Sequence, residues 1–535
     1  MRVTFVAMGW ENISIEYLSA SLKNAGHTCF IAYDQSLFDD KNYVSIKPLA
    51  TFFKDSSCIV EQILKSRPDI IAFSVMTVMY DWCLNLSQVL KTYLDVPIIF
   101  GGYHPTTAPE VVIREKVVDM ICVGEGDIPL LELCNSYIDG KFKKNIPGIW
   151  YKSEDGNIIS LGASKPIEDL NNIPYPDKEL LEKHVPMSNY LLYSLARGCI
   201  YNCHYCSVTT SNNIAREAGI KAFRIVSPKR AIEELKYFKT KYNYKWIDFR
   251  HAIFAFDPKW IIEFCETYKK EINVPFRIFF HPSLVTDEVV KSLVDAKCFT
   301  IQIGLESFDE GLRKEALNRQ ESNEQIHKAI AILEKNKAHY TLDYILGLPG
   351  QKEEELQLVA ELFSRSKYCY RLSPFMCQYL PGSKLIDYGL KIGELTKKDV
   401  AEINQGNHGN YMGEGSIEVY SIEKQRMLRM YRVLFRTMGL LPSYIRIPLV
   451  KSKVYKLFSK LNPIFANIII KFLDIFILIL NRDARGYFIN YLWWIQKRFQ
   501  PSHPYFIFRK TRIKEIRNLN FHTPRTLFRK EFHHE

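Results

Sequence analysis

Three cysteines near the middle of the chain are the residues with the clearest chemical potential. Cys199, Cys203 and Cys206 have the spacing CxxxCxxC and follow a strand-like apolar run at residues 191–196. Thiolates hold iron–sulfur clusters, normally four to a [4Fe–4S] cluster, so three close thiolates leave one iron open to another ligand. Zinc would need a fourth ligand, for which His204 is available, but zinc ligands usually come as two separated pairs and no second pair follows. The spacing therefore predicts a [4Fe–4S] cluster with an open iron.

Short apolar runs alternate with helical patterns through the first 150 residues. The runs lie at residues 2–7, 28–33, 70–74, 96–100 and 120–123. Strands that are apolar on both faces and alternate with helices predict a doubly wound parallel sheet, whose ligand site lies at the carboxyl ends of the strands. Here those ends are residues 74–77, 101–105 and 124–126.

A second α/β series follows a polar connection. Residues 151–190, with Pro and Asn near 171–176, are expected to link two domains. Strand-like runs then lie at residues 191–196, 246–249, 276–280, 300–304, 341–346 and 374–379. Six β/α units predict a full or partial (β/α)6 barrel with catalytic groups on the loops after its strands. The expected division is a sheet domain at 1–150, a linker at 151–190, a barrel at 191–400 and a basic, mostly helical region at 401–535.

The composition excludes several classes of protein. The chain is 47% hydrophobic and 24% charged, as in ordered globular proteins and unlike disordered or collagen-like chains. Its 12 cysteines in 535 residues are too dilute for a disulfide scaffold. Met1 leads into the apolar run 3–7 without a basic segment, so no export signal is expected and the protein is predicted to be cytoplasmic.

The positive charge is concentrated in the last fifth of the chain. Residues 421–535 hold 23 Lys and Arg against 6 Asp and Glu, which predicts an anionic partner such as a membrane surface, a nucleic acid or a phosphorylated substrate. The most apolar stretch, 464–480, is short for a membrane span and contains Lys471 and Asp474. Because these charges are three residues apart, they can pair on one face of a helix. A buried or interfacial helix is therefore expected.

Around the cysteines the sequence resembles the radical SAM superfamily. Arg197-Gly198 precede the cysteines as they commonly do there, and three downstream segments resemble the family's strand-end segments: 303–307, 345–350 and 381–383. The resemblance implies that the open iron binds S-adenosylmethionine (SAM) and that reductive cleavage yields a 5′-deoxyadenosyl radical. It also implies an electron donor such as flavodoxin or ferredoxin. The SAM-binding residues it implies are Tyr205, Glu306, Ser307, Gly347 and Pro349.

The first domain resembles the cobalamin-binding domain fused to many radical SAM enzymes. That group contains carbon and phosphorus methylases and the anaerobic magnesium-protoporphyrin ester cyclase. The resemblance implies bound cobalamin, near Ser74, Thr77, Gly101, Gly102, His104, Gly124 and Glu125. A DxHxxG string is missing, which predicts cobalt without an axial histidine from that motif. The alternative is that these glycines only form the loops of an ordinary Rossmann-like domain.

One segment departs from the pattern of the relatives. After the second barrel strand they often carry F-x-D-D-x-F, whereas this chain reads Phe249-Arg250-His251. His251 is a candidate catalytic group that could replace a lost carboxylate in proton transfer, although a structural role is an equal alternative. His281, at the end of the third barrel strand, is a second candidate on the substrate side.

The expected function is radical SAM methyl transfer. In this reading methylcobalamin supplies a methyl group to an unactivated carbon of a lipid-like or small-molecule substrate, with peripheral contact between the enzyme and an anionic membrane at its inner face. The alternative within the group is an oxidative cyclase or C–C bond-forming enzyme. An RNA-modifying enzyme resembling the methylthiotransferases is disfavoured, because their additional cluster cysteines and an RNA-binding module are not recognisable, so nucleic acid is not expected as a partner.

Overall fold

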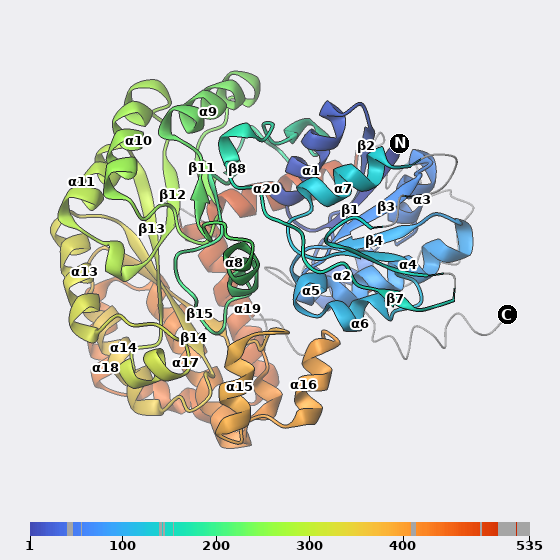
Figure 1. Ribbon diagram of the computed structural model, residues 1–535. Coiled ribbons are helices and arrows are strands. Elements are labelled where there is room, and N and C mark those ends of the chain that lie inside the picture. The colour runs from blue at the N-terminus through green and yellow to red at the C-terminus, as the bar shows by residue number, and fades with distance from the viewer. Residues whose placement is uncertain are drawn as a thin grey trace.

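The computed structural model describes residues 1–39, 46–54, 56–137, 142, 145–153, 155–407, 414–481, 484–500 and 521. An N-terminal α/β domain lies beside a larger barrel domain, and the C-terminal helices lie against the barrel and between the two domains (Figure 1). This arrangement confirms the predicted fold class. The basic tail at 501–520 and 522–535 lies outside the described residues.

The N-terminal domain is a seven-stranded sheet in the order β2-β1-β3-β4-β5-β6-β7. The parallel strands are β1 (Arg2–Met8), β2 (Thr28–Asp34), β3 (Ile70–Ser74), β4 (Ile98–Gly101) and β5 (Met120–Cys122). Helices between them are α1 (Ile13–Asn24), α2 (Lys47–Phe53), α3 (Ser56–Ser66), α4 (Tyr80–Tyr93), α5 (Tyr103–Thr107), α6 (Pro109–Ile113) and α7 (Asp127–Asn135). The 2-1-3-4-5 order is that of a flavodoxin-like doubly wound sheet.

The sheet continues beyond the predicted domain boundary at residue 150. Strands β6 (Ile149–Lys152) and β7 (Ile158–Ile159) extend it in antiparallel fashion. The polar linker expected at 151–190 is in large part packed structure, because Leu170, Leu181 and Val185 are buried. Lys178 is also buried and lies 2.7 Å from the Glu16 carboxylate of α1, a pairing that a buried ammonium requires. Hydrophobic patterning missed this because the buried groups are scattered.

The barrel domain has six parallel strands in the order β15-β14-β13-β12-β11-β8. They are β8 (Leu191–Tyr193), β11 (Ile247–Phe249), β12 (Phe276–Phe280), β13 (Cys298–Glu306), β14 (Tyr340–Leu346) and β15 (Cys369–Met376). The principal outer helices are α9 (Pro228–Tyr242), α10 (Pro258–Glu271), α11 (Asp287–Asp295), α13 (Asn323–Lys335) and α14 (Glu353–Arg365). The barrel is therefore partial, as predicted.

The two faces of these strands differ in chemistry. The apolar core under the outer helices contains Ile247, Ile278, Ile303, Leu342 and Leu372, one residue from each of five strands. Because side chains alternate along a strand, the intervening residues face the lumen. These intervening residues are largely polar or charged, among them Asp248, Arg277, Gln302, Asp343 and Arg371.

Among the described residues six α-helices follow the last barrel strand, and three of them, α17, α19 and α20, connect the side of that strand to the side of the first. The six are α15 (Lys384–Lys391), α16 (Lys397–Asn404), α17 (Ile422–Leu440), α18 (Ser443–Lys451), α19 (Pro463–Leu480) and α20 (Arg485–Arg498). Helix α17 packs on β15, α19 packs on α17, and α20 reaches the β8 side, where Asn189 donates a 2.8 Å hydrogen bond to the Gly486 carbonyl. The expected pairing of Lys471 with Asp474 is wrong: Asp474 pairs with Arg436 of α17, at 2.5 Å, because the carboxylate faces the barrel.

Candidate active site

The cysteine loop begins at a glycine that no other residue could replace without strain. Gly198 has φ +75°, and a side chain there would collide with the Ala222 carbonyl oxygen. The loop follows β9 (Ala196–Arg197), which pairs with β10 (Arg224–Ile225), and it precedes α8 (Val208–Glu217). From α8, Asn212 accepts a hydrogen bond from the Cys199 N–H (3.0 Å) and donates one to the Tyr201 carbonyl (2.9 Å). One helix side chain thus fixes two points of the loop.

The three thiols lie near one another in a desolvated setting. Burial raises the pKa values of Cys199 and Cys206 to about 11 and that of Cys203 to about 12, and neighbouring cysteines add to each shift. Among the described residues no three His, Cys, Asp or Glu side chains are close enough to hold a single metal ion. A tetrahedral zinc with Zn–S of about 2.3 Å would need sulfurs about 3.8 Å apart. Three thiols from one loop suit an iron–sulfur cluster, whose positive charge would hold them as thiolates.

A buried guanidinium connects the cysteine loop to the end of β13. Arg319 donates to the Gly304 carbonyl (2.6 Å) and to the Tyr205 hydroxyl (3.4 Å), and pairs with Glu321 (2.6 Å). Glu306, at φ +64° beyond a register break in β13, lies 3.8 Å from the same guanidinium. Burial raises the pKa of Glu306 to about 7 against the opposing effect of Arg319. The structure therefore brings Tyr205 and Glu306 together through Arg319. No local sequence pattern indicates this role of Arg319.

The other three predicted SAM residues, Ser307, Gly347 and Pro349, are packed against or bonded to other parts of the protein. Ser307 is fully buried and donates to Glu355 (2.5 Å). Gly347, at φ +83°, donates its N–H to Gln351 (2.7 Å) and accepts at its carbonyl from Tyr420. Pro349 is buried in the turn after β14. The hydrogen bonds of Ser307 and Gly347 fix the ends of their strands. Contact between these three residues and SAM stays a prediction.

The two candidate catalytic histidines occupy different surroundings. His281 stacks on Tyr201 of the cysteine loop, with ring centroids 3.9 Å apart, and its Nε2 lies 3.6 Å from Glu321. Burial, and then Arg319, lower its pKa well below the usual value. His251 instead donates from Nε2 to the Phe254 carbonyl (3.0 Å), and burial lowers its pKa to about 4. Both rings are neutral at pH 7, and His281 is the one beside the cluster loop.

A buried carboxylate lies just before the segment in which this chain departs from the pattern of the relatives. Asp248, inside β11, is buried and accepts from Arg277 (2.5 Å) and Arg250 (2.8 Å). Burial alone would raise the pKa of Asp248, but the two guanidiniums outweigh it and lower the pKa. Asp248 directly precedes Phe249, so it lies outside the F-x-D-D-x-F pattern of the relatives.

His104 is an internal residue of the N-terminal domain. Its ring is fully buried, packs at a tilt against Tyr80 with centroids 4.0 Å apart, and shares a 3.2 Å hydrogen bond between Nδ1 and the Thr77 hydroxyl. His104 and Thr77 are therefore brought together at the carboxyl edge of the sheet. Their contact fixes the loops after β3 and β4 relative to one another.

The glycines of this edge allow the chain to approach itself. Gly102 has φ +99°, and a Cβ there would lie 2.9 Å from the Val75 backbone. Gly124 has φ +93°, and its Cβ would lie 2.7 Å from the Ser164 hydroxyl. Gly101 pairs in register with Ser74, so both residues end their strands side by side. The predicted cobalamin residues thus form one contiguous edge, although two of its glycines are required by the protein's own packing.

Ion pairs hold that edge against the cysteine loop. Glu125 accepts from Arg197 (2.9 Å) and Arg224 (2.6 Å), and Arg197 also pairs with Asp127 (2.8 Å). Because Arg197 directly precedes the loop glycine, the carboxyl edge of the sheet faces the cysteines. Tyr103, 40% exposed at this edge, has its pKa raised to about 12 by desolvation and then by the nearby Cys206 and Glu125.

Exposed apolar side chains follow three neighbouring strands at the same edge. Met76, Tyr103 and Ile128 are 39%, 40% and 43% exposed, and they follow β3, β4 and β5. A large flat ligand over the sheet edge would cover these side chains. The edge therefore fits cobalamin, which would lie between the sheet and the cysteine loop.

Two family models match the chain. Residues 193–363 match the radical SAM superfamily, and residues 3–134 match the B12 binding domain. An uncharacterised methyltransferase of Pyrococcus horikoshii is 26% identical over 345 residues, which cover 62% of this chain and 72% of that protein. The anaerobic magnesium-protoporphyrin IX monomethyl ester cyclase of Rubrivivax gelatinosus is 26% identical over 365 residues, covering 66% of this chain and 61% of that one.

Solved structures share the architecture at low sequence identity. The cobalamin-dependent S-adenosylmethionine radical enzyme OxsB, with aqua-cobalamin and S-adenosylmethionine bound, has a TM-score of 0.61 at 14% identity, covering 94% of this chain and 82% of that one. The radical S-adenosylmethionine methyltransferase TsrM from Kitasatospora setae has a TM-score of 0.56 at 13% identity, covering 72% and 77%.

Fold, cysteine loop and family match together define a radical SAM enzyme. More narrowly, the chain combines a radical SAM domain with an N-terminal B12-binding domain, which confirms the resemblance seen in the sequence. Its cofactors are accordingly a [4Fe–4S] cluster, SAM and cobalamin, as predicted, and the thiols and the sheet edge described above fit the first and the last of these.

Proposed function

We propose that the enzyme transfers a methyl group to an unactivated carbon of a lipid-like substrate taken from a membrane surface. The observation that carries methyl transfer is the docking of the B12-binding edge against the cysteine loop through Glu125, Arg197 and Arg224. When bound, the cluster and SAM supply a 5′-deoxyadenosyl radical and methylcobalamin supplies the methyl group.

The residues of the chain hold and orient the reacting groups. Cys199, Cys203 and Cys206 hold the cluster, in a loop fixed by Asn212. Arg319 positions Tyr205 and Glu306 beside that loop. The neutral ring of His281 closes this side of the site without adding charge, and its burial excludes water.

The membrane part of the proposal rests on α19. Among the described residues it is the one helix long and apolar enough to span a membrane. Only 11% of it is buried inside the protein. Its Asp474 is tied to Arg436 of α17, so the helix lies along the barrel with its other face outward. That outward face is apolar, with Ile464, Phe465, Ile468, Phe472, Phe476 and Leu480 all between 43% and 69% exposed.

Cations surround this apolar face. Lys451, Lys453, Lys456 and Lys460 are exposed just before α19, and Lys471 is exposed on it. Each cation near an anionic bilayer contributes about 1 kcal/mol to binding. An apolar face flanked by lysines is typical of a helix that lies in the interface of an anionic membrane.

A radical cyclisation without methyl transfer is the second candidate. The specific observation that favours it is the 26% identity to the Rubrivivax ester cyclase over 66% of this chain. Both candidates use the same cysteine loop, so they differ in whether a methyl group leaves cobalamin.

Anaerobic reconstitution with iron, sulfide and hydroxocobalamin tests the proposal. We expect about four iron atoms and one cobalt per chain, formation of 5′-deoxyadenosine, and transfer of label from [methyl-14C]SAM into solvent-extractable lipid. Deoxyadenosine without label transfer favours the cyclase candidate. Absence of a cluster overturns both.

Vesicle flotation tests the membrane part separately. We expect the enzyme to float with phosphatidylserine-containing vesicles and Phe472→Asp to lose most of this binding. Tyr237→Asp is the matched control, because Tyr237 is 48% exposed on α9, a barrel helix outside the basic C-terminal region. Equal flotation of wild type and Phe472→Asp, or no flotation at all, overturns membrane contact and leaves methyl transfer standing.

A further inference from the structure

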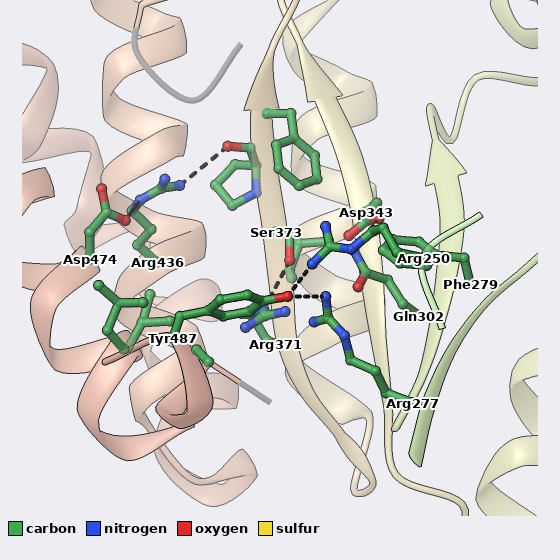
Figure 2. A pocket seen from close by; sticks show the side chains of 16 residues that line it. Arg250, Arg277, Phe279, Gln302, Asp343, Arg371, Ser373, Arg436, Asp474 and Tyr487 are labelled. Atoms are coloured by element: carbon green, nitrogen blue, oxygen red, sulfur yellow. Dashed lines mark hydrogen bonds and ion pairs between the residues drawn. The ribbon is translucent and has the colours of Figure 1, made fainter. Parts of the chain in front are cut away.

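Strand β12 connects the barrel lumen to the cysteine loop. Its residues Arg277 and Phe279 line a cavity in the lumen, which strands β11 to β15 bound on one side and helices α17, α19 and α20 on the other (Figure 2). We call this space the lumen cavity. Because side chains alternate along an extended chain, His281, directly after β12, lies on the same face as these two residues. The lumen wall and the cysteine loop therefore meet at His281.

The ring of His281 stacks on the side chain of Tyr201, which lies between Cys199 and Cys203 in the loop. The two ring centroids are 3.9 Å apart and the ring planes differ by 22°. His281 is only 5% exposed, so its ring is held by the surrounding protein and gives Tyr201 a fixed surface to pack on. The stack therefore fixes the plane of one side chain of the cysteine loop.

Ser283 makes a second connection between the same two side chains. Its backbone N–H donates to His281 Nδ1 (3.2 Å), so Nδ1 is an acceptor and the hydrogen of the neutral ring is on Nε2. The Ser283 hydroxyl lies within hydrogen-bond distance of Nδ1 (2.8 Å) and of the Tyr201 hydroxyl (2.6 Å). Tyr201 is thus held both at its ring face and at its hydroxyl.

The other polar edge of the His281 ring faces a buried carboxylate. Nε2 lies 3.6 Å from a carboxylate oxygen of Glu321, and Arg319 holds Glu321 in place through a 2.6 Å ion pair. The negative charge of Glu321 favours the hydrogen on Nε2, in agreement with the acceptor role of Nδ1. Rotation of the ring would break its contacts with both Ser283 and Glu321. His281 therefore has one preferred orientation, the one in which it stacks on Tyr201.

The backbone of Tyr201 acts on the first cysteine of the loop. Burial raises the pKa of Cys199, and the largest opposing effect is a hydrogen bond from the Tyr201 backbone N–H, which favours the thiolate. Hydrogen bonds to the sulfurs are among the factors that set the reduction potential of an iron–sulfur cluster. Since a reduced cluster carries more negative charge, a donor at this sulfur favours reduction. The placement of Tyr201 therefore affects how readily the cluster accepts an electron.

We propose that His281 is a positioning residue, which sets the reduction potential of the cluster through Tyr201. His281 and Ser283 hold the Tyr201 side chain from the end of β12, and Asn212 of α8 holds its carbonyl (2.9 Å). Together they keep the Tyr201 N–H directed at Cys199. This role goes beyond the proposed methyl transfer, because reduction of the cluster precedes any chemistry at the substrate.

An anaerobic redox titration of the reconstituted cluster, followed by electron paramagnetic resonance, tests this role. His281→Asn keeps an acceptor near the place of Nδ1 but removes the ring, and Tyr201→Leu removes the other ring of the stack. We expect each to make the equilibrium constant for one-electron reduction tenfold smaller, which lowers the midpoint potential by about 59 mV. His281→Phe keeps a ring and should lie closer to the wild type. The double variant should shift no further than either single one, because both remove the same contact.

His327→Asn, at an exposed histidine of α13, is the matched control and should keep the wild-type potential. Thermal unfolding of each cluster-free variant shows whether it folds, and Tyr201→Leu tests the contact from a partly exposed position if His281→Asn does not fold. An unchanged potential or additive shifts overturn the proposal. A shift to higher potential also overturns it, because it would indicate water at the cluster instead of a lost N–H donor. The titration contains no substrate or cobalamin, so failed methyl transfer leaves its result intact.

Discussion

The cysteine loop and the lumen cavity adjoin each other in the barrel but are stabilised in opposite ways. The loop is one short segment whose backbone is fixed by Asn212 of a single helix, while the charged Arg319 contacts it only through the Tyr205 hydroxyl. The cavity lining comes from five strands and three helices and is held by buried ion pairs such as Asp248 with Arg277. Loop substitutions should therefore remove chemistry and spare the fold, whereas lumen substitutions should affect the fold first.

The largest expected effect is in the loop. Cys203→Ala removes one of three cluster ligands, so iron content and 5′-deoxyadenosine formation should fall below detection while the melting temperature of the cluster-free chain changes little. Iron analysis, the SAM cleavage assay and thermal unfolding measure these quantities. Cys265→Ala, a buried cysteine under the barrel helices, is the control and should keep its iron. Full activity of Cys203→Ala would contradict the assignment of the cluster.

The lumen should respond with loss of stability. Asp248→Asn is nearly isosteric but leaves Arg277 and Arg250 without their shared carboxylate. Removing one partner of a buried pair costs about 3–5 kcal/mol, so we expect a loss of that size in the free energy of unfolding, measured with urea.

An exposed ion pair supplies the control for this lumen variant. Glu271→Gln breaks the surface pair with Lys236 and should cost at most about 1 kcal/mol. If the two substitutions cost the same, the lumen ion pairs do not support the fold in the way that their burial indicates.

Local patterns explain why most of the fold could be predicted from the sequence. The apolar run predicted at 276–280 coincides with β12 (Phe276–Phe280). The last strand was misplaced: 374–379 was expected, but β15 is Cys369–Met376. Its first half carries Arg371 and Ser373 on the lumen face, so it does not read as an apolar run. The polar residues on the lumen face thus made the first half of β15 unrecognisable as a strand, although packing on α17 and β14 stabilises it.

Long-range contacts explain what the sequence did not indicate at the site. The cysteines and the glycines are recognisable from their neighbours in the chain, because a loop or a turn imposes them. Asp248 and Arg277 are 29 residues apart, and Arg319 reaches Tyr205 across 114 residues. Which of the many charged residues meet depends on strand register and on the placement of α20, neither of which a local pattern contains.

A smaller effect is expected at Asn212, which fixes the backbone of the cysteine loop. Asn212→Ala removes the acceptor for the Cys199 N–H and the donor for the Tyr201 carbonyl. Loss of a group that orients metal ligands typically costs 10- to 100-fold in metal affinity, so the cluster should be lost to a chelator correspondingly sooner. Iron retention against EDTA measures this. Asn213→Ala, on the same helix outside these contacts, should retain iron as wild type does; equal retention by both variants would show that Asn212 does not hold the loop.

The smallest effect is expected at His251, and it distinguishes a structural role in the barrel wall from a role in the reaction. Burial lowers its pKa to about 4, so between pH 6.5 and 4 the unfolded chain binds a proton that the folded chain does not. That difference makes His251 reduce stability as the pH falls, by about 1.4 kcal/mol per pH unit in this window. His251→Gln should lose less unfolding free energy than the wild type between pH 6.5 and 5.5, because it lacks the group that takes up this proton. Formation of 5′-deoxyadenosine at pH 7.5 should change by at most about twofold. The matched variant of the exposed His327 should keep the wild-type slope. A large loss of activity with an unchanged dependence of unfolding free energy on pH would instead show that His251 is accessible to solvent and takes part in the reaction. The barrel wall next to Arg250 would then be part of the active site.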